Sequence, residues 1–149
     1  MLHLKTAKLS RWQVRLIVVS GLVLLLTGIA WLLLHHFGQR EGEFGPETNP
    51  LEPWMLRLHG AAMIASLLGV GSLLVVHVWR GWQYRSQRLI GIVLSTGVAW
   101  LILSGYLLYY VADEEWRAWL SISHWVAGLT GLPVFILHYT KGQKVRRSS

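Results

Sequence analysis

Four histidines lie inside two of the most apolar stretches of the chain. His59 and His77 belong to one stretch, and His124 and His138 belong to another, each long enough to cross a lipid bilayer. A polar side chain in hydrocarbon is costly and usually serves a function. Imidazole is also the commonest metal-binding side chain of proteins. These four residues are therefore the first candidates for chemistry.

The spacing places both histidines of each stretch on one face of a helix. The 18 residues from His59 to His77 make five whole turns at about 100° per residue, and the 14 residues from His124 to His138 fall within about 40° of four turns. A lone histidine near a membrane interface is more often a hydrogen-bonding residue than a ligand. Two helices that each carry two histidines on one face favour a shared ligand instead.

The two stretches also match in depth. His59 lies five residues after Trp54, and His124 lies five residues after Trp119. The second histidine of each stretch lies close to a basic segment at the other end. The sequence therefore predicts an upper and a lower pair of imidazoles on two helices that run in the same direction.

Two imidazoles are too few for most metal ions. Zinc and copper usually take three or four protein ligands at about 2 Å. The chain has no cysteine, which excludes disulfides, thiolate metal sites, iron–sulfur clusters and haem attached through a cysteine pair. A haem supplies four equatorial nitrogens and needs only two axial ligands, so the pattern predicts bis-histidine haem b. Two haems are expected, and one is not excluded.

Other residues near the histidines could support such a ring. Three cations are candidates for pairing with haem propionates, although they could instead reach lipid phosphates: Arg57, Arg80 and Lys141. Glycines within the apolar stretches could leave room for the ring edge, or could simply permit close helix packing: Gly21, Gly28, Gly91, Gly97, Gly105, Gly128 and Gly131.

The elements that carry these residues are predicted to be transmembrane helices. The chain of 149 residues is 53% hydrophobic and only 14% charged, well below the roughly 25% typical of soluble domains. Four segments are long and apolar enough to span a bilayer: residues 14–37, 54–79, 89–111 and 119–139. Short links make consecutive helices antiparallel. We expect an all-α membrane protein, with residues 1–149 forming one antiparallel four-helix transmembrane bundle.

The charges predict how the chain is oriented. Eleven of the 14 basic residues lie in the N-terminal segment, the link at 80–88 and the C-terminal tail, whereas all seven acidic residues lie in the other two links. By the positive-inside rule both termini are cytoplasmic. The net charge of +7 is thus a topology signal and not the basic patch of a nucleic-acid-binding protein. The first span is too long for a typical signal peptide, and we expect it to be retained.

The segment SHWVAGLTGLPVFILH, residues 123–138, together with the four spans, resembles the bacterial four-helix di-haem cytochrome b proteins. These include the bacterial cytochrome b561 type and the cytochrome b subunits of formate dehydrogenases and hydrogenases. The resemblance implies that His59 and His124 bind an external haem and that His77 and His138 bind an internal one. It also implies one-electron transfer across the inner membrane, often between a quinol and a redox protein.

The chain departs from that family in two respects. The rise from His59 to His77 is about 27 Å, against about 21 Å from His124 to His138, so the inner pair is less well matched. Several relatives take a ligand from the first helix, which here offers only His35 and His36 at its external end. These two could replace His59, or could line an external docking or quinone site.

Several functions stay open at the level of sequence. The simplest is an electron relay in the bacterial inner membrane, with lipid around it and a quinone, a redox protein or a larger oxidoreductase complex as partner. A quinone reaction needs a proton acceptor, for which His35, His36 and Glu52 are candidates; a small oxidant such as superoxide is a variant. The alternatives are a histidine-based metal-handling or transport protein, and a membrane anchor subunit without redox activity.

Overall fold

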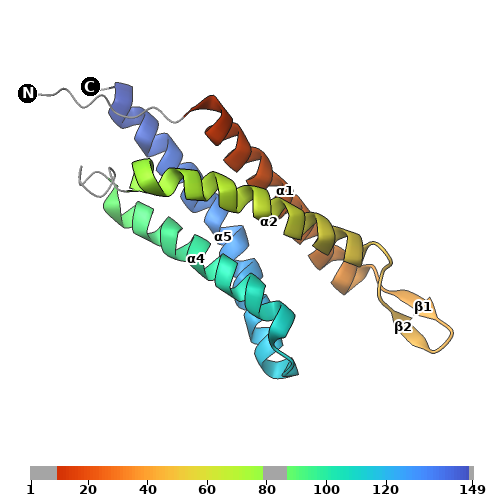
Figure 1. Cartoon of the computed structure of the whole chain (residues 1–149). Coiled ribbons are helices and arrows are strands. Elements are labelled where there is room, and N and C mark those ends of the chain that lie inside the picture. Colours follow the sequence, from red (N-terminus) through yellow and green to blue (C-terminus); the bar gives the residue numbers. More distant parts are fainter. Residues whose placement is uncertain (1–9, 79–86, 148–149) are drawn as a thin grey trace, which may run out of the picture. The chain divides into compact units, whose positions relative to one another are not determined.

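The computed structural model describes residues 10–78 and 87–147 and contains two compact units. The first unit runs from Met1 to Trp79 and the second from Arg80 to Ser149. Each unit is a pair of long helices joined at one end (Figure 1). The candidate Arg80 lies outside the described residues.

The first unit consists of α1 (Arg11–Phe37) and α2 (Glu52–Leu73). A capping box starts α1, because the Ser10 hydroxyl accepts the Gln13 backbone N–H at 3.4 Å while the Gln13 side chain accepts the Ser10 N–H at 3.0 Å. Gly38 ends α1 at its C-cap, and a proline in the first turn starts α2. The helix bounds agree with the predicted spans 14–37 and 54–79 to within a few residues at three of the four ends.

The connection between α1 and α2 contains a small β-hairpin that the sequence analysis did not anticipate. Strand β1 (Arg40–Gly42) pairs antiparallel with β2 (Gly45–Glu47). The turn pairs Gly42 with Gly45, and Gly45 has a φ of +122°, a conformation that favours glycine. The predicted link at 38–53 is therefore partly ordered by its own strands.

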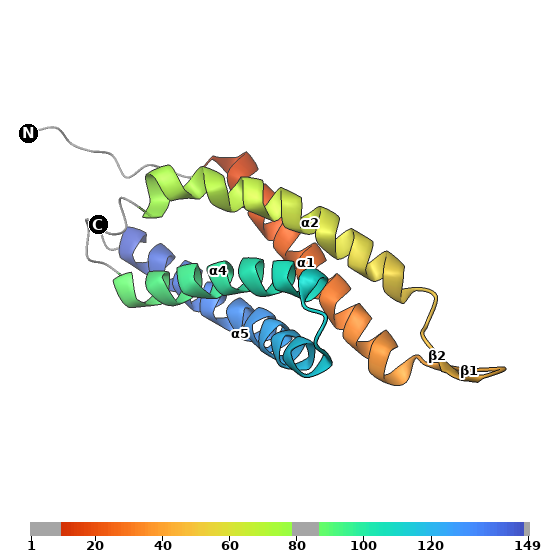
Figure 2. The same ribbon diagram turned by 60° about the horizontal axis from the view of Figure 1, so that its bottom comes forward.

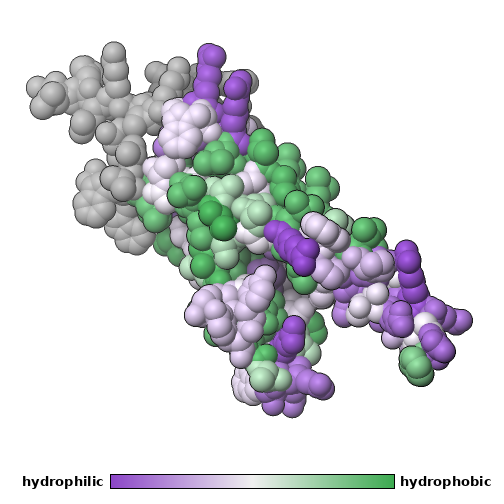
Figure 3. Space-filling view, turned by 45° about the vertical axis from the view of Figure 1, so that its right-hand side comes forward, coloured by the Kyte–Doolittle hydropathy of each residue, from purple (hydrophilic) through white to green (hydrophobic). Residues whose placement is uncertain are grey.

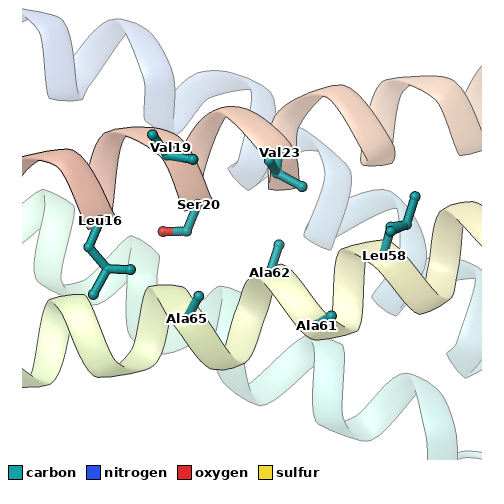
Figure 4. A pocket seen from close by; sticks show the side chains of 8 residues that line it. All are labelled: Leu16, Val19, Ser20, Val23, Leu58, Ala61, Ala62 and Ala65. Carbon is teal, nitrogen blue, oxygen red and sulfur yellow. The ribbon is translucent and has the colours of Figure 1, made fainter.

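Helices α1 and α2 are antiparallel and are joined by polar contacts at both ends and in the middle. The joined pairs are Gln13 with Ser72, Thr27 with His59, and His35 with Glu52. Small residues allow close approach between these contacts. Figure 4 shows Ser20 of α1 facing Ala62 and Ala65 of α2 in an open apolar groove of about 250 Å³.

The end of the second helix is wound differently from the rest. Residues Leu74–Val78 form a π-helix, η1, that continues α2 and contains His77. A π-helix bonds each residue to one five positions away, so it turns less per residue than an α-helix. The count of five α-helical turns between His59 and His77 therefore does not describe this last segment.

The second unit consists of α4 (Arg88–Tyr110) and α5 (Glu114–Arg147), shown running side by side in Figure 2. The acidic turn is shorter than the predicted 112–118, because the Asp113 carboxylate accepts the Trp116 backbone N–H at 2.9 Å and starts the helix there. Pro133 lies within α5 without ending it. Contacts of Gly128 with Leu101 and of His124 with Ser104 show that α4 and α5 are antiparallel.

The helices place most of their hydrophobic side chains outward. Ala62 is the one buried hydrophobic residue of the described segments, whereas many leucine, valine and tryptophan side chains are exposed. Figure 3 shows hydrophobic side chains spread over the sides of the helices. Four helices are long and apolar enough to cross a membrane: Arg11–Phe37, Glu52–Leu73, Arg88–Tyr110 and Glu114–Gly142. The expectation of a mostly helical chain with four such spans is confirmed.

Candidate histidine site

The Thr27 hydroxyl and Gly28, both on α1, lie against the ring of His59. Its ring nitrogen Nδ1 lies 3.0 Å from the Thr27 hydroxyl, and only 8% of Thr27 is exposed. A Cβ added at Gly28 would lie 3.5 Å from the His59 Cε1 atom. The imidazole therefore packs directly on the backbone of α1, at a point where the neighbouring residue has no side chain.

His124 has a matching hydroxyl and a matching glycine in the other unit. Its Nδ1 lies 2.9 Å from the hydroxyl of Ser104, which is fully buried. A Cβ added at Gly105 would lie 3.3 Å from the His124 Cε1 atom, closer than in nine of ten ordinary Cβ contacts. The ring thus packs on the backbone of α4 as the His59 ring packs on α1.

We call each of these arrangements a histidine triplet: a hydroxyl residue, the glycine that follows it and the histidine that both contact. The triplets are Thr27, Gly28 and His59, and Ser104, Gly105 and His124. In both, the hydroxyl also lies 2.6 Å from the backbone carbonyl four residues earlier in its helix, that of Val23 or Trp100. Two histidines in different helical hairpins therefore have matching hydrogen bonds and matching packing.

His138 has different surroundings. Gln87, the residue just before α4, has a φ of +61°, and its side chain contacts His138. With its amide oriented to satisfy both ends, the Gln87 nitrogen donates to His138 Nδ1 at 3.3 Å and to the His138 carbonyl at 3.2 Å, and its oxygen accepts the Gly142 backbone N–H at 2.9 Å. Nδ1 of His138 is thus an acceptor in this arrangement. His77, on η1, is half-buried.

The candidate cations lie outside the helix contacts. The Arg57 guanidinium is 4.8 Å from the centre of the Trp54 ring, a cation–π contact at the start of α2. Lys141 is exposed on α5. Both side chains are therefore at the surface of their hairpins, where a propionate or a lipid phosphate could reach them.

A polar cluster closes the end of the first hairpin that carries the connection between α1 and α2. The Glu52 carboxylate is buried, lies 3.1 Å from His35 Nδ1 and accepts the backbone N–H of Asn49 at 3.3 Å. The Trp31 ring stacks on His35 at 4.7 Å, and His36 meets the edge of the same imidazole. Two of the proposed proton acceptors, His35 and Glu52, are thus hydrogen-bonded to each other.

The structure bears on the metal-handling alternative. Among residues 10–78 and 87–147, no three histidine, aspartate or glutamate side chains are grouped closely enough to hold a metal ion. A ligand that needs fewer than three protein donors remains compatible with the histidines.

Comparison of the chain with models of known families, with curated proteins and with solved structures gives no match. The histidines therefore have to be interpreted from their own geometry. The residue pattern of the sequence predicted His59 and His124 as ligands but gave no sign of the Thr27 and Ser104 hydroxyls that contact them. Gln87 was also not identified.

Proposed function

We propose that this protein transfers single electrons across a bacterial inner membrane through b-type haem. His59 and His124 would hold an external haem, and His77 and His138 would hold an internal one. The observation that carries the proposal is the repeated histidine triplet, which gives two histidines of separate hairpins the same partners. Isolated packing histidines have no reason to share such an arrangement.

The number and type of the candidate ligands suit haem b. Two imidazoles are the number that bis-histidine haem requires, and haem b needs no covalent bond to cysteine, which the chain lacks. Glycine beside each ring leaves the imidazole close to the helix backbone, so that its far edge can project from the hairpin. When bound, haem supplies reversible one-electron oxidation and reduction of iron.

The chain's own residues orient the ligands and exclude water. The Thr27 and Ser104 hydroxyls fix two imidazoles, and the apolar helices keep the surroundings at low polarity, which is one determinant of redox potential. Arg57 is available to the propionates of the external haem. Lys141, and by its sequence position Arg80, are available to those of the internal haem. None of these roles requires an acid, a base or a nucleophile.

The inner pair is less well supported than the outer pair. Gln87 donates to His138 Nδ1, so the proton of a neutral ring lies on Nε2, where a metal would otherwise bind. Haem binding by His138 through Nε2 therefore requires the contact between Gln87 and Nδ1 to be lost. The outer haem is the primary proposal, and the inner haem depends on this rearrangement.

The arrangement of charges supports an orientation with cytoplasmic termini and an acidic external face. A quinol or a redox protein would exchange electrons with the haem at either face. For a quinol, the hydrogen-bonded pair of His35 and Glu52 is the proton acceptor that the structure offers at the external end. A basic partner protein would be attracted by the acidic links.

Electron transfer across the membrane is tested with vesicles that contain the haem-loaded protein and trapped ferricyanide. A membrane-impermeant reductant added outside should bleach the ferricyanide in wild-type vesicles and not in vesicles with His124→Ala protein. Equal rates in both, at equal protein content, would exclude the relay. A haem-loaded wild type that never reduces ferricyanide would also exclude it.

A further inference from the structure

We infer that Thr27 and Ser104 are positioning residues that set the tautomer of neutral His59 and His124. The ring hydrogen lies on Nδ1, so that Nε2 of each ring carries the lone pair a metal needs. The inference rests on the proposed function for its haem role. Its geometrical basis is the pair of histidine triplets. The hydroxyls act through the imidazoles and would not touch the haem.

The direction of the hydroxyl proton follows from the short contact to the backbone. A hydroxyl has one proton to donate, and a carbonyl oxygen can only accept. The Thr27 oxygen is 2.6 Å from the Val23 carbonyl, and the Ser104 oxygen is 2.6 Å from the Trp100 carbonyl. These distances require the hydroxyl proton between the two oxygens.

The imidazole must then be the donor in the second contact. At 3.0 Å for His59 and 2.9 Å for His124, Nδ1 and the hydroxyl oxygen are hydrogen-bonded. Because the hydroxyl has already used its proton, Nδ1 carries the hydrogen. The lone pair of a neutral ring is then on Nε2.

A hydrogen bond from the second ring nitrogen to a fixed acceptor is typical of metal-binding histidines. Such a histidine usually donates its other N–H to a fixed acceptor, which sets the tautomer, orients the ring and makes the ligand more basic. Here the acceptor is a hydroxyl, which is itself aligned by a helix carbonyl. Gly28 and Gly105 add the close approach that brings each ring within reach of its hydroxyl.

Each hairpin contains its own histidine triplet. Thr27 and His59 belong to the first unit, and Ser104 and His124 belong to the second. His138 supplies an internal contrast. Its Nδ1 accepts from Gln87, which gives the opposite tautomer. The inference therefore predicts two tautomers among the intramembrane histidines of one chain.

The tautomers can be measured without haem. The full chain, labelled with ¹⁵N-histidine in detergent at a pH above the ordinary histidine pKa of about 6.5, should show a protonated Nδ1 for His59 and His124. Signals are assigned by their loss in His59→Asn and His124→Asn. Thr27→Val should shift His59 towards the Nε2–H form, whereas Thr27→Ser should keep the wild-type form.

A second readout is the affinity for haem and the redox potential. Thr27→Val should weaken haem binding by roughly 10- to 100-fold, as loss of a ligand's hydrogen-bonding partner commonly does. The remaining bound haem should have a higher midpoint potential, because a less basic ligand favours ferric iron less. Thr27→Ser should restore both values. Ser104→Ala and Ser104→Thr provide the same comparison in the other hairpin.

The outcomes separate the two proposals. A wild type that binds haem, with unchanged affinity and potential in Thr27→Val and Ser104→Ala, overturns this inference and leaves the relay intact. A protonated Nε2 on wild-type His59 and His124 also overturns it. A folded wild type that binds no haem refutes the proposed function and the haem role of both hydroxyls with it.

Discussion

The ring of His124 lies closer to the facing helix than the ring of His59 does. The added Cβ would be 3.3 Å from the ring at Gly105 and 3.5 Å at Gly28. The first distance requires the imidazole to move by a few tenths of an ångström, whereas the second is an ordinary contact. The position of the His124 ring is therefore more sensitive to a side chain added at Gly105 than the position of the His59 ring is to one added at Gly28.

We expect Gly105→Ala to lower the haem content and Gly105→Val to lower it further, because each step pushes the His124 ring away from Ser104. Overpacking of this kind costs roughly 1–3 kcal/mol. Haem per polypeptide and the height of the reduced α-band measure the effect. Gly71→Ala is the control, since it is not one of the glycines considered for the ring edge and its Cβ would meet no atom within 4 Å. Full haem content in Gly105→Val would contradict the placement of the ring.

Asn49 is a structural residue in the connection between β2 and α2 of the first hairpin. Its side chain donates to the Gly38 carbonyl at 2.9 Å and accepts the Leu51 N–H at 3.0 Å, and the residue is buried. Asn49→Ala leaves both backbone groups without this partner, so we expect a loss of about 1–3 kcal/mol in the free energy of unfolding. Thermal unfolding in one detergent measures it.

Thr48→Ala is the control for that substitution, because Thr48 is the exposed neighbour and should change stability by less than about 0.5 kcal/mol. Equal melting temperatures for the Asn49 and Thr48 variants would show that the buried amide does not brace the loop.

The hydroxyl partners illustrate what the sequence alone could not resolve. Thr27–Gly28 and Ser104–Gly105 are hydroxyl–glycine pairs, but the same pattern occurs in apolar segments at Ser20–Gly21, Thr96–Gly97 and Thr130–Gly131. Only the register between antiparallel helices decides which pair faces a histidine. The four histidines were identifiable because an imidazole in an apolar stretch is conspicuous; a serine there is not.

At the scale of helices, hydropathy predicted the four spans, and local hydrogen bonds determined their ends. The last helix begins at Glu114 and not at the predicted 119, because Asp113 caps it and the acidic residues of its first turn stabilise a helix N-terminus. The π-helical segment around His77 has no comparable signal in hydropathy. Periodicity arguments that assume a uniform α-helix are therefore weakest at that histidine.

The contact of α1 with α2 depends on Gly69. A Cβ there would be 2.8 Å from Ile17 Cγ1 and 3.6 Å from Leu16, so Gly69→Ala forces side chains to move. We expect it to destabilise the full chain by roughly 1–3 kcal/mol, measured by thermal unfolding. Gly71→Ala, with no neighbouring atom within 4 Å, carries the same gain in helix propensity and should not destabilise.

A background of Ile17→Ala provides the second test of that contact. Removing the Ile17 side chain should reduce the cost of Gly69→Ala, since residues in contact are energetically coupled. Additive effects of the two substitutions would contradict direct packing of Ile17 on Gly69.

For the whole molecule, the charge distribution predicts an external link between α1 and α2 and cytoplasmic termini. The chain has no cysteine, so single cysteines report topology without background. Phe44→Cys, at a position that is 95% exposed, should react with a membrane-impermeant maleimide in intact bacterial cells. Ser149→Cys should react only after the cells are permeabilised. Labelling of Ser149→Cys in intact cells would reverse the proposed orientation.

The central claim is that His59 and His124 bind haem, and haem stoichiometry tests it most directly. Protein purified from haem-supplied cells should give a six-coordinate b-type reduced-minus-oxidised spectrum with two haems per polypeptide, or with one if the inner site does not form. His59→Ala and His124→Ala should each lose the same haem. A folded wild type without haem, or either variant with wild-type haem content, would contradict the account.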